Sequence, residues 1–175
     1  WQTQAACFVM PGGRDSPYHE SLNPAGITKI QEYVQTGGAY LGICAGAYFA
    51  AKQIEFALGS SIEVNQERTL KFYEGTASGP VFADFEYHTQ KGAHAAQIAF
   101  AETSAMIYFN GGCTFLDAEK VSNLQIIGHY QLNDGKKLPA IVHIKHGRGC
   151  VILSGVHFEF DPKTMDANDS HLSTV

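Results

Sequence analysis

Apolar runs separated by glycine and proline give the first third of the chain a strand, helix, strand, helix order. Residues 5–9 form a short apolar run that Pro11-Gly12-Gly13 ends, as expected for a buried strand followed by a loop. Apolar residues at helical spacing follow Asn23-Pro24, with asparagine as the N-cap and proline at the first helical position. Gly37-Gly38 is a suitable end for that helix.

A second strand and a second helix meet at Cys44. Residues 39–43 are short and mostly apolar, and residues 45–52 are rich in alanine. Gly42 and Gly46 flank the cysteine, which allows a turn sharp enough to form a nucleophile elbow. The nearby helix N-terminus would stabilise a thiolate. The alternative is that Cys44 is a small buried apolar residue, the common role of a free cysteine.

Beyond Gln53 the chain consists mainly of short β-branched or aromatic segments bounded by glycine. We expect strands at residues 61–64, 70–73, 97–100, 106–109, 126–130, 140–144 and 150–153. His146-Gly147-Arg148-Gly149 is typical of a hairpin turn, and the polar tail at 166–175 is expected to fray. The whole pattern predicts an α/β sandwich around a mainly parallel sheet, with a β-rich excursion on one side.

Composition restricts the classes of function. A chain of 175 residues with 45% hydrophobic and 17% charged residues predicts one globular core, and no apolar run is long enough to cross a bilayer. The formal net charge of -5, without a cluster of lysine or arginine, argues against a nucleic-acid partner. Because the chain opens at Trp1, we expect a processed or truncated product. A removed signal peptide stays an alternative to the favoured cytoplasmic location.

The four cysteines are widely spaced and include no C-x-x-C pair, which argues against a structural zinc site, a thioredoxin-type site and a disulfide framework. Cys7 and Cys150 lie in apolar runs and are expected in core strands. His143 and His146 point to opposite faces of a strand, which makes a shared metal improbable. The sequence therefore predicts neither a metal nor a cofactor.

An activated cysteine needs a base, because a free thiol with a pKa of about 8.5 is mostly protonated at neutral pH. His157 follows the strand that ends in Ser154-Gly155, and Glu159 lies two residues later, on the same side of an extended chain. Cys44, His157 and Glu159 would then be nucleophile, base and orienting carboxylate. His157 could instead be an ordinary hydrogen-bonded residue at a strand end. The histidines without a partner at useful spacing are His19, His88, His94, His129 and His171.

Acyl chemistry at a cysteine passes through an oxyanion, which backbone N–H groups aimed at one point can stabilise. Gly12, Gly13 and the amide of Ala45 are the candidates, since the loops after parallel strands gather at one edge of a sheet. Pro-Gly-Gly is also a common loop sequence, so a purely structural role is an equal alternative.

These loops, in the order Pro-Gly-Gly, Gly-x-Cys-x-Gly and His-x-Glu, resemble class I glutamine amidotransferase-like domains. Three blocks are more similar still to the amidotransferase-like domain at the N-terminus of eukaryotic biotin-protein ligases, a domain that also occurs free-standing in bacteria. The blocks are Val9 to Tyr18, Gly37 to Tyr48 and Tyr108 to Gly112. The similarity extends from about Ala5 to Phe160.

The resemblance implies a flavodoxin-like three-layer sandwich with a Cys-His-Glu triad over residues 1–175, and no biotin ligation by this domain. It also implies that a strand and a helix that normally precede the Pro-Gly-Gly loop are missing. The implied partners are a small-molecule substrate and either a synthetase or ligase domain or a second copy of the chain. The substrate pocket would include Arg14, Asp15, Tyr48, Asn110 and Gly111.

Tyr48 departs from the resemblance, because working glutamine amidotransferases usually carry glutamine at that position. Phe158 likewise stands where proline usually follows the triad histidine, and Ala45 stands where the related intracellular proteases have histidine. Two functions therefore remain. One is a thiol enzyme acting on a small amide or ester. The other is a ligand-binding or regulatory module that keeps the pocket without turnover.

Overall fold

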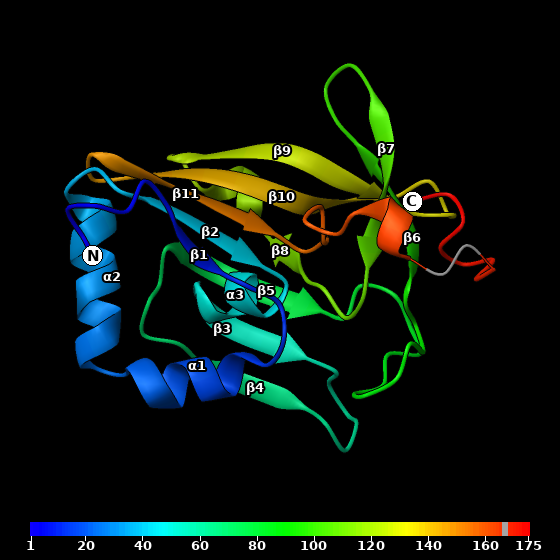
Figure 1. Ribbon diagram of the computed structural model, residues 1–175, viewed down its shortest axis with the longest axis horizontal. Helices are drawn as coiled ribbons and strands as arrows, with labels where there is room; N and C mark the ends of the chain where they lie inside the picture. The colour runs from blue at the N-terminus through cyan, green and yellow to red at the C-terminus, as the bar shows by residue number, and fades with distance from the viewer. Residues whose placement is uncertain (166–167) are drawn as a thin grey trace.

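The computed structural model describes residues 1–165 and 168–175 and shows a mixed α/β fold with a curled sheet and few helices (Figure 1). The main sheet has seven strands. In spatial order they are β1 (Phe8–Met10), β2 (Ala39–Ile43), β11 (Gly149–Ser154), β10 (Lys137–His146), β9 (Leu124–Gln131), β6 (His94–Ala99) and β7 (Ser104–Phe109). β1, β2 and β11 are parallel, and every other neighbouring pair is antiparallel.

A smaller, four-stranded sheet packs below the first in the view of Figure 1. Its strands in spatial order are β4 (Val64–Glu67), β3 (Ala51–Phe56), β5 (Tyr73–Gly79) and β8 (Thr114–Leu116). β3 and β5 are parallel, and β4 and β8 pair antiparallel at the two edges.

The helices pack against the parallel end of the main sheet. α1 (Asp15–Leu22) and α2 (Ala25–Gln35) lie at the surface, and α2 turns Ile27, Ile30 and Val34 into the core. α3 (Ala45–Phe49) is buried on all sides and contacts strands of both sheets. Two short 3₁₀ turns complete the described elements, η1 (Ala118–Lys120) and η2 (Pro162–Thr164). Across the described ranges, no helix has the length and apolar character that a bilayer crossing requires.

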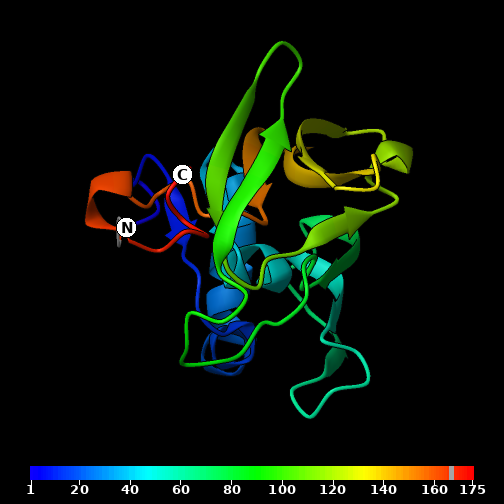
Figure 2. The same ribbon diagram turned by 90° about the vertical axis from the view of Figure 1, so that its right-hand side faces the viewer.

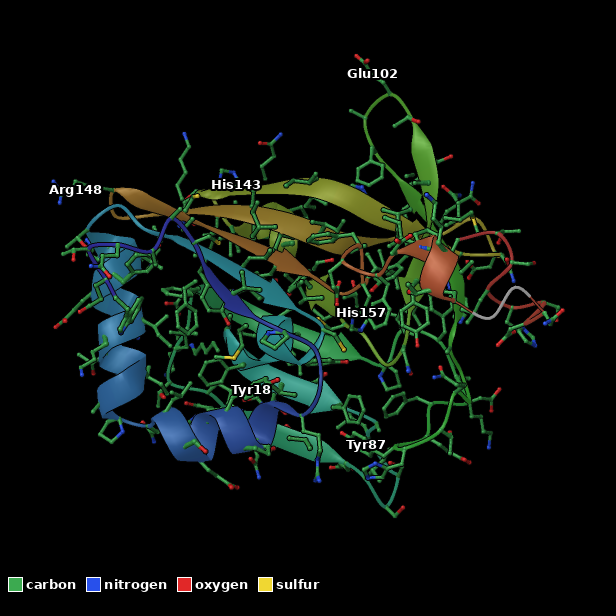
Figure 3. The ribbon with its side chains drawn as sticks, viewed as in Figure 1. Tyr18, Tyr87, Glu102, His143, Arg148 and His157 are labelled. Carbon is green, nitrogen blue, oxygen red and sulfur yellow. The ribbon has the colours of Figure 1, made fainter. Side chains whose placement is uncertain are left out.

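The β6–β7 hairpin projects from the body of the molecule in both views (Figures 1 and 2), with Glu102 at its tip (Figure 3). The turn between β10 and β11 carries Arg148 at the far end of the sheet from His157 (Figure 3). Gly147 in this turn has φ +58, a conformation that favours glycine, and the predicted hairpin at residues 146–149 is confirmed.

The prediction of a mainly parallel sheet is wrong. Short connections join β6 to β7, β9 to β10 and β10 to β11, and a short connection forces neighbouring strands to run antiparallel. Most segments assigned to a β-rich excursion therefore continue the main sheet. The flavodoxin-like three-layer sandwich is not confirmed by this arrangement.

Several local predictions are also corrected. The helix expected over residues 45–52 ends at Phe49, because Ala51 begins β3 and pairs with β5. Asn23 does not cap α2 with its side chain, and α2 starts at Ala25 with Pro24 at the cap position. The strands expected at 61–64 and 70–73 begin at Val64 and Tyr73. Helix α1 was not predicted from the apolar pattern, since none of its residues is buried.

Cys7 is exposed, against the prediction of a core position, because it precedes β1 at the edge of the sheet. Cys150 is half-buried in β11. Of the tail expected to fray, residues 166–167 lie outside the described residues. Within residues 168–175 the tail contacts the body of the protein at two points: Leu172 is buried, and the carbonyl of His171 accepts a hydrogen bond from the amide of Ala95 at 2.8 Å.

Candidate functional site

Cys44 lies at the junction of β2 and α3 with a strained backbone, φ 49 and ψ -105. A non-glycine residue rarely adopts positive φ, and such strain is concentrated at functional sites. The turn depends on its glycines. A Cβ on Gly46 would stand 2.1 Å from the carbonyl oxygen of Met10, and one on Gly42 would stand 2.6 Å from the carbonyl oxygen of Gly46.

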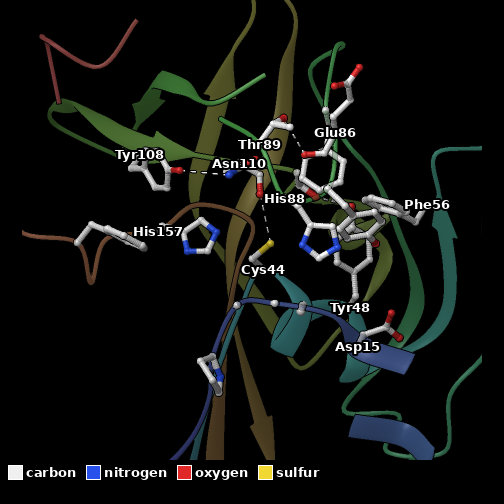
Figure 4. A pocket seen from close by; sticks show the side chains of 18 of the residues that line it. Asp15, Cys44, Tyr48, Phe56, Glu86, His88, Thr89, Tyr108, Asn110 and His157 are labelled. Atoms are coloured by element: carbon white, nitrogen blue, oxygen red, sulfur yellow. Dashed lines mark hydrogen bonds between the residues drawn. The ribbon is translucent and has the colours of Figure 1, made fainter. Parts of the chain in front are cut away.

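The surroundings of Cys44 hold the sulfur at the floor of a cavity. The residue is 7% exposed, and its amide donates to the carbonyl of Ser154 at 2.8 Å, which ties the turn to the end of β11. Its Sγ lies 3.6 Å from the carbonyl oxygen of Asn110 (Figure 4). β2, β11 and the chain after β7 thus converge on the thiol.

His157 reaches the same cavity from the segment after β11. Its amide donates to the carbonyl of Tyr108 at 2.8 Å, and its Nδ1 lies 2.7 Å from Oε1 of Glu159. The ring also packs against Gly12, where an added Cβ would stand only 2.6 Å from Cε1, and against the rings of Tyr108 and Phe160. The imidazole therefore has one orientation, with Nδ1 toward the carboxylate.

Opposing effects act on the pKa of His157. Burial disfavours the imidazolium, but hydrogen bonding and charge interactions with Cys44 and Glu159 outweigh it and raise the pKa from 6.5 to about 9. At neutral pH the structure therefore favours a protonated His157. A protonated imidazole next to a sulfur atom and a carboxylate can deliver a proton to a leaving group.

The raised pKa predicts how stability depends on pH. A group whose pKa is higher in the folded than in the unfolded state stabilises the fold when it is protonated. For His157 this contribution is complete below the unfolded-state pKa of about 6.5, and it is lost as the pH rises through the folded-state pKa of about 9. We expect the difference in unfolding free energy between the parent chain and His157→Gln to be larger at pH 7 than at pH 10, measured by urea denaturation. A difference that grows toward pH 10 would contradict this sign.

The loop after β1 forms a second side of the cavity. The amide of Gly46 donates to the carbonyl of Pro11 at 3.1 Å, and the hydroxyl of Tyr18 donates to the carbonyl of Gly12 at 2.9 Å. Gly13 has φ +132, which favours glycine. The Ala45 amide is the first of α3, so its own helix offers it no acceptor. The three residues proposed to bind an oxyanion, Gly12, Gly13 and Ala45, thus all border the cavity.

The cavity has a volume of about 410 Å³, a size suited to a small molecule. Of the expected pocket residues, Asp15, Tyr48, Asn110 and Gly111 line it together with Cys44, His157 and Glu159. Arg14 is not among the lining residues, and its guanidinium lies 5.3 Å over the ring of Tyr87. Tyr48 is buried and donates to the carbonyl of Gly111 at 3.2 Å. No three histidine, cysteine or acidic side chains of the described ranges are grouped as a metal site requires.

Sequence reasoning missed much of the cavity wall. The segment between β5 and β6 contributes several lining residues, among them His88, which had no partner at useful spacing in the sequence (Figure 4). Tyr87 and Tyr108 line the cavity, whereas Phe72, Tyr73 and Phe109 are buried in the core. The lining residues that were not predicted are Phe56, Phe85, Glu86, His88, Thr89 and Phe160.

Asn110 has a polar atom without a partner. Its Nδ2 donates to the hydroxyl of Tyr108 at 3.2 Å, while its Oδ1 is buried and accepts no hydrogen bond from the described residues. A buried acceptor of this kind needs a donor, which a ligand or water in the cavity can supply.

Comparisons with known proteins place the chain in a family. Residues 1–174 match the family model described as biotin-protein ligase, N terminal. The biotin-protein ligase of Schizosaccharomyces pombe is 42% identical over 166 residues, which cover 91% of this chain and 26% of the ligase. An uncharacterized protein of Chlamydia muridarum is 39% identical over 167 residues, 93% of this chain and 64% of that protein. The chain thus spans less than two thirds of either relative.

The similarity to solved structures concerns the fold alone. Gan42B, a GH42 β-galactosidase, superposes with a TM-score of 0.52 at 12% identity, covering 89% of this chain and 19% of that one. A β-galactosidase from Rahnella sp. R3 gives a TM-score of 0.52 at 12% identity, over 87% of this chain and 20% of that one. The match over nearly the whole chain, together with the 42% identical ligase, shows that this chain belongs to the biotin-protein ligase N-terminal domain family.

Proposed function

We propose that this domain is a thiol enzyme that acts on a small amide or ester, with Cys44 as nucleophile, His157 as proton carrier and Glu159 as its orienting carboxylate. One observation carries the proposal: the strained Cys44 and the His157–Glu159 pair, 2.7 Å apart, open into the same cavity. Steric strain at a strand-to-helix turn is the geometry of a nucleophile elbow. The resemblance to class I glutamine amidotransferase-like domains supports the same assignment.

The chemistry follows from the charge of His157. The sulfur attacks the carbonyl carbon, and the resulting oxyanion is stabilised by the amides of Gly12, Gly13 and Ala45. The carbon–nitrogen or carbon–oxygen bond breaks as the imidazolium gives its proton to the leaving group. The neutral imidazole then takes a proton from water, which attacks the thioester and releases the acid and the thiolate. A pKa of about 9 for His157 suits the first of these proton transfers.

Alkylation of Cys44 tests the proposal without knowledge of the substrate. Iodoacetamide is applied at pH 7, and the labelled peptides are quantified by mass spectrometry. We expect His157→Ala to slow alkylation of Cys44 by about tenfold, because the imidazolium no longer stabilises the thiolate. The exposed Cys7 is an internal reference whose rate should not change.

His143→Ala is the matched control, since His143 lies on β10 and does not line the cavity. It should leave the alkylation of Cys44 unchanged. An equal rate for Cys44 in the parent chain and in His157→Ala would overturn the assignment of an activated nucleophile.

A second function is favoured by the contact between Cys44 Sγ and the carbonyl of Asn110 at 3.6 Å, because that acceptor competes for the thiol proton. Tyr48 also occupies the position where working glutamine amidotransferases usually have glutamine. A binding or regulatory module would keep its affinity for a ligand in Cys44→Ser and release no product from any amide. Release of ammonia that depends on Cys44 would exclude this function.

A further inference from the structure

The charged residues around the cavity restrict what it can bind. Among the described residues that line it there is no lysine or arginine, whereas Asp15, Glu86 and Glu159 all carry carboxylates. Glu159 is occupied by His157, and Glu86 is paired with Lys91 at the exposed rim. The imidazolium of His157 is already paired with Glu159, so a carboxylate at the far end of a substrate has no lysine or arginine partner among the described lining residues.

Asp15 is held in place from behind. Arg68 is 1% exposed, and its Nε and Nη2 both lie 2.7 Å from Oδ2 of Asp15. The remaining guanidinium donors reach Gln66, the carbonyl of Glu67 and Ser16. A buried arginine with all its donors engaged is costly to desolvate, and here it fixes one carboxylate at the cavity wall. Oδ1 of Asp15 accepts no hydrogen bond from the described residues and is available to a ligand.

Asp15 lies on the other side of Cys44 from His157 (Figure 4). A substrate whose reacting carbonyl is at Cys44 and whose leaving group faces His157 would extend its acyl chain toward Asp15. The residue is therefore placed to bind the far end of the acyl group and not the reacting atoms.

Aromatic rings line the same part of the cavity. Phe56 and Phe85 meet edge to face with ring centroids 5.5 Å apart, and Phe85 meets Tyr87 in the same way at 5.0 Å. Aromatic faces attract cations. The ring of Tyr87 already contacts a cation, since the Arg14 guanidinium lies 5.3 Å from its ring centroid.

We propose that the substrates of this cavity are small amides or esters whose acyl chain ends in an ammonium group, with Asp15 as the specificity-determining residue. The inference rests on the proposed function, which supplies the reacting amide or ester. It adds that the opposite end of the acyl chain carries a positive charge. Asp15 would accept a hydrogen bond from the ammonium through Oδ1, and the aromatic wall would contact the chain and the cation.

Three primary amides of similar length test the inference: δ-aminovaleramide, which is cationic, hexanamide, which is neutral, and glutaramate, which is anionic. Binding to Cys44→Ser is measured by calorimetry, and ammonia release is measured with the parent chain. We expect the cationic amide to bind at least about tenfold more tightly than hexanamide, and glutaramate to bind most weakly. Equal affinities, or tightest binding of glutaramate, would overturn the inference.

Asp15→Asn, made in the Cys44→Ser background, should bring the affinity for the cationic amide down to that for hexanamide and leave hexanamide unchanged. Asp134→Asn is the matched control, because Asp134 forms an exposed ion pair with Lys136 and does not line the cavity. It should preserve the preference. If Asp15→Asn fails to fold because Arg68 loses its partner, the order of affinities for the three amides, measured in Cys44→Ser alone, still tests the preference for a cation.

Binding and turnover separate the two proposals. A clear preference for the cationic amide without ammonia release from any of the three would support this inference and contradict the proposed enzyme. Ammonia release that depends on Cys44 but is equal for the cationic and neutral amides would support the enzyme and overturn the role of Asp15.

Discussion

A single methyl group on Gly12 is expected to reduce Cys44-dependent turnover by about 100-fold. The Cβ of Gly12→Ala would stand 2.6 Å from Cε1 and 3.4 Å from Nδ1 of His157. The ring cannot simply turn aside, because Nδ1 is bonded to Glu159 at 2.7 Å and the ring faces Tyr108 and Phe160. A displacement of about 1 Å in a proton-transfer group is enough for a loss of this size.

Ammonia release from the cationic amide, or from whichever amide the parent chain cleaves, measures this effect. The imidazole NMR signal of His157 reports the displacement directly, and it should shift and titrate at a lower pH once the bond to Glu159 is broken. Gly26→Ala is the matched control: it makes the same substitution in α2, away from the cavity, and should leave turnover unchanged. Full turnover in Gly12→Ala with an unchanged His157 signal would show that the ring does not depend on Gly12.

The local structure around Cys44 was predictable because it depends on neighbours in the sequence. One glycine on each side of a cysteine, directly after an apolar strand, favours a tight turn independently of the rest of the fold. The spacing of His157 and Glu159 is local in the same sense, since side chains two apart in extended chain point the same way. The bond between them follows from that spacing.

The direction of the strands was not predictable from their apolar character. Burial on both faces produces the same run of apolar residues in a parallel and in an antiparallel strand. The lengths of the connections carry the missing information. The turn at residues 146–149 was recognised as a hairpin, and the same argument applied to β6–β7 and β9–β10 would have indicated an antiparallel sheet.

The far wall of the cavity depends on contacts between distant segments. Asp15 and Arg68 are 53 residues apart in the chain, and nothing near either residue indicates the pair. The segment between β5 and β6 supplies Phe85, Tyr87 and His88 from a stretch with positive φ at Asp84 and His88, where no helical or strand periodicity exists. The cavity wall around Cys44, His157 and Glu159 was therefore predictable from the sequence, whereas the pairing of Asp15 with Arg68 and the wall formed by the segment between β5 and β6 required the structure.

Gly46→Ala is expected to destabilise the protein by about 3 kcal/mol, although helix propensity alone predicts the opposite. In an exposed helix, alanine in place of glycine stabilises by about 1 kcal/mol. Here the added Cβ would stand 2.1 Å from the carbonyl oxygen and 2.7 Å from the carbonyl carbon of Met10, which are backbone atoms of β1. Neither can move without breaking the hydrogen bond between the Gly46 amide and the Pro11 carbonyl, so overpacking outweighs propensity.

Urea denaturation of the parent chain, Gly46→Ala and Gly26→Ala measures the effect. At Gly26 the three atoms nearest the new Cβ all belong to the side chain of Leu22, with Cδ2 at 2.9 Å and Cβ at 3.1 Å. A small shift of that half-buried side chain relieves the contact, so the variant should stay within about 1 kcal/mol of the parent. If Gly46→Ala were as stable as Gly26→Ala, α3 would have to shift away from β1. Ala45 would move with α3 relative to Gly12 and Gly13, so the proposed oxyanion site would be disturbed together with the tight turn that holds Cys44.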